Sequence, residues 1–399
     1  MKKTVFLAAA AVALASCSSD ELVNNSAVNE APIAFNVGQK NITRGDAVTS
    51  SKLEDAGYYD FGVWAYKTKK DADDNLVSQQ VMNNYQVGCA GYGAFKSSTL
   101  TTGDWFYEGL NKQILRYWDL SYTNTNFYAY APYNSAVTFS ETDKKITVPA
   151  SVNKAGTEHD VIYAGTKMTN SDLAKVPLQF KHLGAKVNIN FYEDIPGYKV
   201  ELLEVTNDGD IQATPAKHEG TTYSAGKYFT ESEATIAYDE NMVPTATVDV
   251  TGEGNSNTNL VFKLPDDKKV PAVVTNGTQT YLESPTTYYA VAQPTTSTTG
   301  FTFHVSFKLT AEDNNEVIIV RDARVFVPAN DGNGKYIAAW QPNTKYIYTF
   351  KITKDTTGTT AETTPDVNDP TVPDTPALYP IIFDNITIVD YENTSEYKE

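Results

Sequence analysis

The sequence predicts an all-β protein built from two tandem β-sandwich domains and a C-terminal extension strand. The first observation is that short runs of alternating apolar and polar residues recur between turn signals along the chain, which is the pattern of β-sandwiches. The second is that long stretches of helical periodicity are scarce, whereas Tyr and Gly, at 26 and 23 residues, are abundant. The third is the length of 399 residues, which is too long for one ordinary core and suggests two domains.

The expected strands follow one another in the order in which the alternating runs occur. They lie at residues 33–37, 61–66, 126–130, 186–192, 199–205, 288–292, 301–309, 317–327 and 345–353. Clusters of Asn, Asp and Gly at 207–210, 276–277 and 330–334 mark turns between some of them. A short helix is expected around residues 178–186.

A polar stretch at 169–172 suggests the boundary between the two domains, because strand-like character resumes directly after it. The expected organisation is a signal segment at 1–17, a linker at 18–30, sandwich domains at 31–175 and 176–353, a Thr/Pro/Asp-rich linker at 354–378 and a donor-strand segment at 379–399. The second linker cannot supply a core, and its prolines favour extended conformations. The apolar strand after it suits the edge of a sheet, its own or another molecule's.

The N-terminus is a secretory signal. A basic start at residues 1–3 precedes an apolar run at 4–15, and the segment closes with Leu-Ala-Ser-Cys at Cys17. This ending resembles a bacterial lipobox, which implies cleavage before Cys17, lipidation of its thiol and attachment to a membrane by lipid. The alternative is an ordinary signal peptide with an incidental cysteine. The acidic residues in 18–21 are similar to the export tag of surface lipoproteins in some Gram-negative bacteria, so a surface-exposed outer-membrane lipoprotein is expected.

The charge balance limits the partners that the chain could bind. Its formal net charge is -17, from 49 acidic and 32 basic residues, and without a cluster of Lys and Arg no nucleic-acid binding is expected. Acidic copies repel one another, so self-association would need specific contacts. Cys17 and Cys89 are the only cysteines, which leaves no internal disulfide once Cys17 is lipidated.

The sequence offers little chemistry. Asp71, Asp73 and Asn75 echo a calcium loop, but Leu76 and Met82 stand where that loop needs Gly and Glu. The four histidines lack metal-ligand spacing, and no motif of a hydrolase, zinc protease or phosphate-binding loop occurs. We therefore expect no enzyme, no cofactor and no metal site.

Three further features have a bland and a functional interpretation. Cys89 is expected to be buried rather than nucleophilic, and His182 to be a packed core histidine rather than a ligand. The aromatic residues between 105 and 118 could line a sugar-binding face, but they are more typical of a sandwich core.

Several segments together resemble one family. They are Phe-Gly-Val-Trp-Ala-Tyr at 61–66, Asn-Phe-Tyr-Ala-Tyr-Ala-Pro-Tyr at 126–133, Asp-Val-Ile-Tyr-Ala at 160–164, Leu-Gln-Phe-Lys-His-Leu-Gly-Ala-Lys-Val at 178–187 and Trp-Gln-Pro-Asn-Thr-Lys-Tyr-Ile-Tyr at 340–348. In this order, with the lipobox and the C-terminal strand, they resemble the fimbrillin family, the lipoprotein precursors of type V pili in Gram-negative gut and oral anaerobes. The resemblance implies that both sandwich domains are transthyretin-like.

The resemblance also implies an assembly mechanism. In the family a trypsin-like Arg-specific protease removes the first strand, and the C-terminal strand of another subunit fills the groove left behind. Here the cut would fall at Arg44, in a polar loop of the kind that proteases favour, and would discard the strand within 31–43. The donor face would be the alternating residues Ile381, Phe383, Thr387, Val389 and Tyr391. A head-to-tail contact of this kind generates a filament.

Alternatives stay open at this point. The C-terminal strand could pair with its own sheet, and Arg44 could be an ordinary loop residue. The protein could also remain lipid-anchored, as a tip or anchor subunit or as a surface binder of glycan or host protein, since a fold-level resemblance does not settle function.

Overall fold

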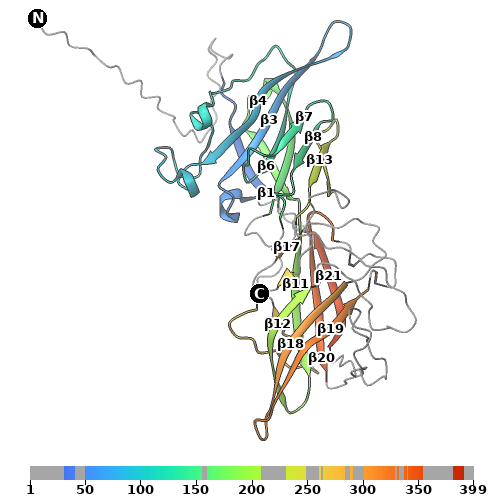
Figure 1. Ribbon diagram of the computed structural model, residues 1–399. Helices are drawn as coiled ribbons and strands as arrows, with labels where there is room; N and C mark the ends of the chain where they lie inside the picture. Colours follow the sequence, from blue (N-terminus) through green and yellow to red (C-terminus); the bar gives the residue numbers. More distant parts are fainter. Residues whose placement is uncertain are drawn as a thin grey trace, which may run out of the picture.

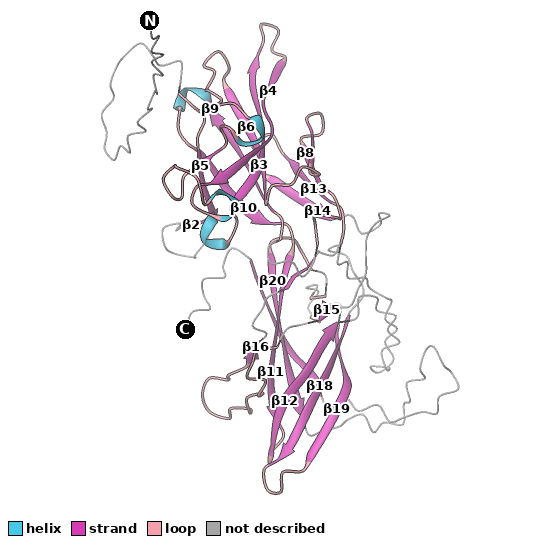
Figure 2. Ribbon diagram, turned by 60° about the vertical axis from the view of Figure 1, so that its left-hand side comes forward, coloured by secondary structure: helices cyan, strands magenta, loops and turns pink. Residues whose placement is uncertain are grey.

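The computed structural model describes residues 31–40, 50–154, 160–207, 231–248, 260–261, 264–283, 288–290, 301–328, 330–331, 337–338, 340–353 and 381–390. The protein is all-β, as the sequence predicts (Figure 2), because the regular structure in these ranges consists of strands and short 3₁₀ helices. The latter are η1 (Leu53–Ala56), η2 (Gly93–Phe95), η3 (Leu110–Lys112) and η4 (Asn170–Asp172). Within the described residues, none of the helices has the length and apolar character needed to cross a bilayer.

The first sandwich has an eight-stranded sheet and a four-stranded sheet. The larger sheet runs, in spatial order, β2 (Ser50–Lys52), β1 (Phe35–Lys40), β10 (Val176–His182), β9 (Ile162–Thr169), β6 (Asn124–Ala131), β3 (Asp60–Lys70), β4 (Leu76–Cys89) and β5 (Trp105–Phe106). The smaller sheet runs β14 (Pro244–Val248), β13 (Ala234–Tyr238), β8 (Lys145–Val148) and β7 (Thr138–Ser140).

Strand β3 shows why the larger sheet lies at the centre of this sandwich. Phe61 and Val63 belong to one core cluster, which also holds residues of β1, whereas Trp64 and Tyr66 belong to a second cluster against the smaller sheet. Alternate side chains of a strand point to opposite faces, so the buried run at 61–66 must be covered on both sides.

Two expectations differ from the observed pairing. The helix expected at 178–186 is wrong: β10 buries every second residue, which is the period of a strand. The expected domain boundary at 175/176 does not follow the sheets either, because β10 pairs with β1 and β9 of the first sandwich. The polar stretch that suggested the boundary forms η4, which joins β9 to β10.

The second sandwich also has two sheets. One runs β16 (Leu282–Glu283), β11 (Ala185–Asp194), β20 (Thr344–Thr353) and β21 (Ile381–Asp390), with β17 (Tyr288–Ala290) also on β11. The other runs β15 (Leu260–Val261), β12 (Tyr198–Asn207), β18 (Phe301–Ala311) and β19 (Val317–Val327). A core around Phe303, Phe350 and Trp340 lies between them, and the rings of Phe303 and Phe350 are 5.1 Å apart.

The two sandwiches are stacked end to end, with β1 in one and β21 in the other (Figure 1). The chain crosses between them after β10, where the amide of Asn343 donates to the carbonyl of Gly184 at 3.0 Å and the amide of His182 donates to Oδ1 of Asn343 at 3.0 Å. These bonds tie the start of β20 to the end of β10.

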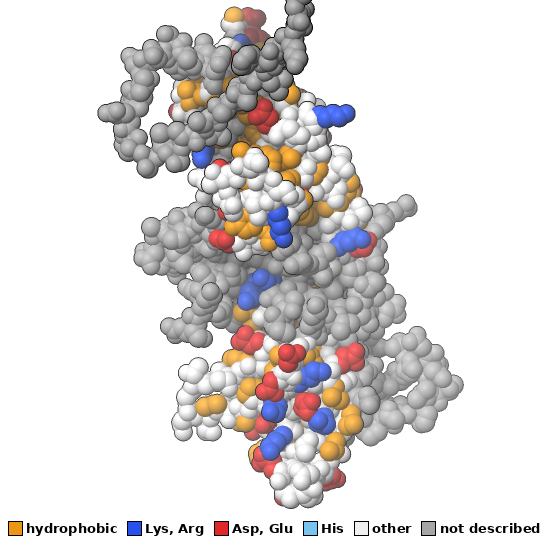
Figure 3. Space-filling model, turned by 90° about the vertical axis from the view of Figure 1, so that its left-hand side faces the viewer, with side chains coloured by type: hydrophobic (Ala, Val, Ile, Leu, Met, Phe, Trp, Pro, Cys, Tyr) orange, Lys and Arg blue, Asp and Glu red, His pale blue; other side chains and the backbone are white. Residues whose placement is uncertain are grey.

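Charges of both signs are mixed on the face of the second sandwich seen in Figure 3. Two ion pairs of this sandwich join Lys308 to Glu201 at 2.5 Å and Lys351 to Asp194 at 2.7 Å. A surface of alternating sign does not attract a polyanion, so this face gives no support to nucleic-acid binding.

Candidate functional site

The first strand, β1, lies inside the larger sheet rather than at its edge. Its register with β10 is parallel and places Phe35 opposite Val176 and Val37 opposite Leu178. On its other side, Gly38 pairs antiparallel with Lys52 of β2. Removal of β1 would therefore leave a gap between two strands that both follow residue 44 in the chain.

Phe35 is the anchor of this strand. Its side chain is 5% exposed, and its ring makes edge-to-face contacts with Phe61 at 5.4 Å, Phe127 at 6.0 Å and Tyr107 at 6.1 Å. Each aromatic pair contributes about 0.5–1.5 kcal/mol beyond the burial itself. Ile33, two residues earlier, is buried as well, so this part of the chain fills an apolar groove.

Residues 116–118 form a wall along the start of this groove. The amide of Ile33 donates to the carbonyl of Arg116 at 2.8 Å, and the amide of Trp118 donates to the carbonyl of Ala31 at 3.0 Å. Pro32 is directly opposite Tyr117. The hydroxyl of Tyr107 also donates to the carbonyl of Ile33 at 2.9 Å, which adds a third bond to the strand.

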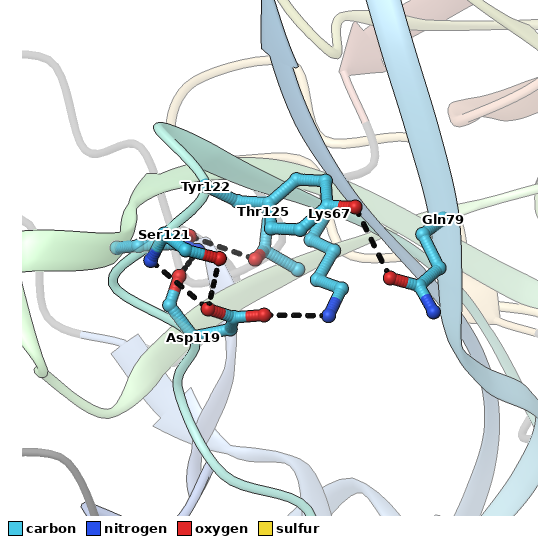
Figure 4. Close-up of polar contacts among 7 residues, drawn as sticks. Lys67, Gln79, Asp119, Ser121, Tyr122 and Thr125 are labelled. Atoms are coloured by element: carbon cyan, nitrogen blue, oxygen red, sulfur yellow. Dashed lines mark hydrogen bonds and ion pairs between the residues drawn. The ribbon is translucent and has the colours of Figure 1, made fainter.

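The wall is held in place at both ends by contacts that do not involve β1. At its start, the Arg116 guanidinium donates through Nε to the hydroxyl of Tyr85 on β4 at 2.8 Å and lies over the Tyr85 ring. At its end, Asp119 accepts a bond from the Lys67 ammonium of β3 at 2.6 Å (Figure 4). The side-chain amide of Asn170 in η4 donates through Nδ2 to the Asp119 carbonyl at 2.7 Å.

The Asp119 anchor gives a pH-dependent prediction. The bond from Lys67, followed by the bond from the Ser121 hydroxyl, lowers the pKa of Asp119 from 3.8 to about 2. A lowered pKa contributes stability that is present above about pH 4 and is lost as the pH falls toward 2. Because the carboxylate is 35% exposed, we expect Asp119→Asn to lower the free energy of unfolding by only about 1 kcal/mol near neutral pH. Below pH 4 the difference in this free energy between the variant and the wild type should shrink.

Urea unfolding at a series of pH values measures this difference. The matched control is Asp74→Asn, which breaks the more exposed pair with Lys70 on the β3–β4 hairpin and should leave stability nearly unchanged. If the loss of unfolding free energy in Asp119→Asn stays constant down to pH 2, the lowered pKa of Asp119 does not stabilise the fold.

The last strand, β21, stands at the end of its sheet order and pairs antiparallel with β20. Phe383 is half-buried there, with its ring 6.0 Å from Phe350 and 6.4 Å from Tyr348. This strand thus pairs with its own sheet in the monomer, which is one of the alternatives left open by the sequence.

Three of the predicted site residues lie outside the described residues, namely Cys17, Arg44 and Tyr391. Ile381, Phe383, Thr387 and Val389 lie in β21. The first two are opposite Ile352 and Phe350, whose side chains belong to the core.

A β-bulge at Asp384 interrupts the alternation expected for this strand. Beyond it, Ile386 and Ile388 stand opposite the core residues Tyr348 and Tyr346. The predicted residues Thr387 and Val389 stand opposite Ile347 and Lys345, which lie on the other face of β20. The sequence carried a signal for this, since adjacent Asp and Asn are poor strand residues and a bulge shifts the face by one residue.

Other residues singled out in the sequence have structural roles. Cys89 is fully buried, as predicted. His182 is a buried histidine, also as predicted, and its Nδ1 lies 2.8 Å from Oδ1 of Asp160, which accepts a second bond from Tyr58 at 2.9 Å. Asp71 accepts the amides of Asp73 and Asn75, which closes an exposed hairpin turn. In the part of the chain that is described, no three His, Cys, Asp or Glu side chains gather where they could hold a metal.

Most of the predicted aromatic cluster is core. Tyr107 and Trp118 are each 3% exposed, and Trp105 packs against the same cluster. Tyr117 is the exception at 48% exposed. The core interpretation therefore holds for the buried aromatic residues of this cluster. The sequence did not predict the wall at 116–118, to which Tyr117 belongs.

Comparison with known proteins identifies relatives of this chain. The fimbrillin-like family matches residues 47–369. Fimbrium subunit Fim1C of Phocaeicola vulgatus is 29% identical over 147 residues, which are 37% of this chain and 34% of that protein. The match thus spans about a third of that relative's length.

A solved structure shares the fold. The crystal structure of a fimbrial protein from Bacteroides vulgatus aligns with a TM-score of 0.54 at 15% identity, over 90% of this chain and 99% of that one. At this identity the likeness concerns the fold alone.

Proposed function

The chain belongs to the fimbrillin-like family, and on that premise we propose that it is a structural subunit of a surface fimbria that polymerises by protease-triggered strand exchange. A trypsin-like protease cuts at Arg44, the segment with β1 departs, and β21 of another copy enters the gap. The subunit is exported as an outer-membrane lipoprotein held through Cys17 until it is processed. Adhesion to a host or bacterial surface ligand would be a property of the assembled fimbria.

The observation that carries this proposal is the contrast between the two strands. β1 lies between β2 and β10, whereas β21, among the strands that the structure describes, is last in its sheet and bonds to β20. A strand that moves from an edge to a gap gains a second ladder, and each hydrogen bond contributes roughly 0.5–1.5 kcal/mol net. This gain favours exchange over the pairing of β21 with its own sheet.

Burial favours the same direction. Phe383 is half-buried in its own sandwich, while Phe35 in the groove is 5% exposed. Moving the Phe383 ring from its own sandwich into the Phe35 site therefore removes more apolar surface from water. These gains can offset the repulsion between copies of an acidic chain, whose full sequence has a formal net charge of -17.

The positions of the two strands support a filament rather than a closed dimer. The gap would open in the first sandwich, and β21 is in the second (Figure 1). A contact between two different surfaces is head-to-tail, and such contacts propagate into open chains unless a ring closes.

Cleavage at Arg44 should convert the purified mature protein from monomers into ladders and filaments, because the cut frees the segment that fills the gap. Trace trypsin starts the reaction, and mass spectrometry, native gels and electron microscopy follow it. Arg44→Ala should block both the cut and assembly. Its control is Lys40→Ala, which removes a nearby basic residue and leaves Arg44 intact.

Two results would count against the proposal. Resistance at Arg44, or a clean cut that leaves monomers, would instead favour a lipid-anchored binding protein or a tip or anchor subunit that does not polymerise.

A further inference from the structure

The strand in the groove and the last strand share a sequence pattern. Residues 32–36 read Pro-Ile-Ala-Phe-Asn, and residues 380–384 read Pro-Ile-Ile-Phe-Asp. Pro-Ile occurs at only these two places among the 399 residues. In both segments, therefore, an Ile and a Phe stand on the same face of an extended chain, with a Pro directly before the Ile.

We propose that the groove is a receptor for this pattern and takes the last strand of a second copy in one register, with its Pro380 at the Pro32 position, Ile381 at the Ile33 position and Phe383 at the Phe35 position. The inference rests on the proposed function, since the groove must first be vacated. The inference adds to that function the register of the incoming strand and the groups of the groove that determine this register.

The wall at 116–118 selects the position of the proline. The amide of Ile33 and the carbonyl of Ala31 make the two bonds to the wall, so Pro32 between them stands at a non-hydrogen-bonded position. Proline has no N–H and is tolerated only where the ladder needs none. A strand shifted by one residue in one direction would put Pro380 at the Ile33 position, where the wall requires an amide. A one-residue shift in either direction would also turn the face that carries Ile381 and Phe383 away from the groove.

The aromatic site selects the position of the phenylalanine. Phe61, Tyr107 and Phe127 surround the Phe35 ring. A shift of two residues keeps the same face inward, but it puts either Ile381 or Asn385 in this site. The smaller side chain leaves a void, and the amide would be buried among rings without a bonding partner.

The wall persists after the first strand has left, because its anchors lie elsewhere. Tyr85 of β4 holds Arg116, and Lys67 of β3 holds Asp119. Departure of the strand frees the carbonyl of Arg116 and the amide of Trp118, which bonded to Ile33 and Ala31. These two backbone groups are then available to the incoming strand, at the spacing that the departed strand used.

Disulfide trapping tests the register. Residues opposite each other in a non-hydrogen-bonded antiparallel pair have Cα atoms about 4.5 Å apart, which is within disulfide range. Tyr117→Cys full-length protein is mixed with Pro380→Cys full-length protein, both in a Cys17→Ser background, and the mixture is cleaved and oxidised. Cys89 is fully buried, so it does not compete.

The expected result is a disulfide-linked dimer on a non-reducing gel for Tyr117→Cys with Pro380→Cys. The controls Leu378→Cys and Ile382→Cys, each one two-residue shift away, should cross-link at least tenfold less. Because Tyr117 is half exposed, its replacement by Cys should leave the fold intact. Assembly of each mixture, seen by electron microscopy, checks that the variants fold.

The outcomes separate this inference from the proposed function. Filaments with equal cross-linking at all three positions, or with none at position 380, would overturn the single register and leave strand exchange standing. Failure of the parent protein to assemble after cleavage would remove the proposed function and this inference with it.

Discussion

Replacing Phe35 with alanine should lower the free energy of unfolding of the uncut protein by about 3–5 kcal/mol, the range for truncating a buried Phe. The ring is 5% exposed and contacts three other aromatic rings. Two of those rings, Phe61 and Phe127, belong to the paired strands β3 and β6, so the site has little freedom to collapse into the void. The loss should therefore lie at the upper end of the range.

The same substitution should change what happens after cleavage. The hydrogen bonds of β1 to its neighbours remain, but its largest apolar contact is gone, so the cut segment should leave the groove faster. Urea unfolding measures the first effect, and the loss of the segment from the cut protein, followed by chromatography and mass spectrometry, measures the second.

Asn36→Ala is the matched control for Phe35→Ala. It lies on the same strand and is exposed, so it should change stability by less than about 0.5 kcal/mol. If the two variants unfold at the same urea concentration, Phe35 is not the anchor of this strand and the groove is not a specific aromatic site.

Local patterns in the sequence were sufficient to predict about half of the strands, whereas others, such as β4, were missed. The runs at 61–66, 126–130 and 345–353 lie within β3, β6 and β20, because a short run rich in aromatic and other apolar residues is visible in each strand by itself. Partner choice is a property of distant segments. The β13–β14 hairpin joins β8 of the first sandwich although the second sandwich begins before it, and nothing in its own residues specifies that partner.

The site was predicted less completely than the fold, for a related reason. The first and last strands are visible as apolar runs, and the expected donor residue Phe383 packs against the core of its own sandwich. The wall at 116–118 makes an isolated bridge rather than a strand, so it has no period to detect. Its importance follows from the two anchors, Arg116–Tyr85 and Asp119–Lys67, which join residues that are far apart in the sequence.

Deleting residues 379–399 should abolish filament formation after cleavage, while the cut at Arg44 proceeds as in the parent protein. The truncated chain keeps the groove but has no strand to donate. It should also lose stability in its second sandwich, by roughly 3–5 kcal/mol, since Phe383 leaves Phe350 and Tyr348 and the ladder with β20 is gone. Native gels and electron microscopy report assembly, and urea unfolding reports stability.

Deletion of residues 392–399 is the control, because it retains all of β21 and should assemble normally. A mixing experiment makes the test sharper. A cleaved chain without its last strand can accept a donor but cannot give one, so it should end every filament that it joins. Filaments grown from mixtures should therefore shorten as the truncated fraction rises. If truncated chains form filaments alone, or leave filament length unchanged in the mixture, the last strand is not the donor, and contacts elsewhere on the two sandwiches must hold the subunits together.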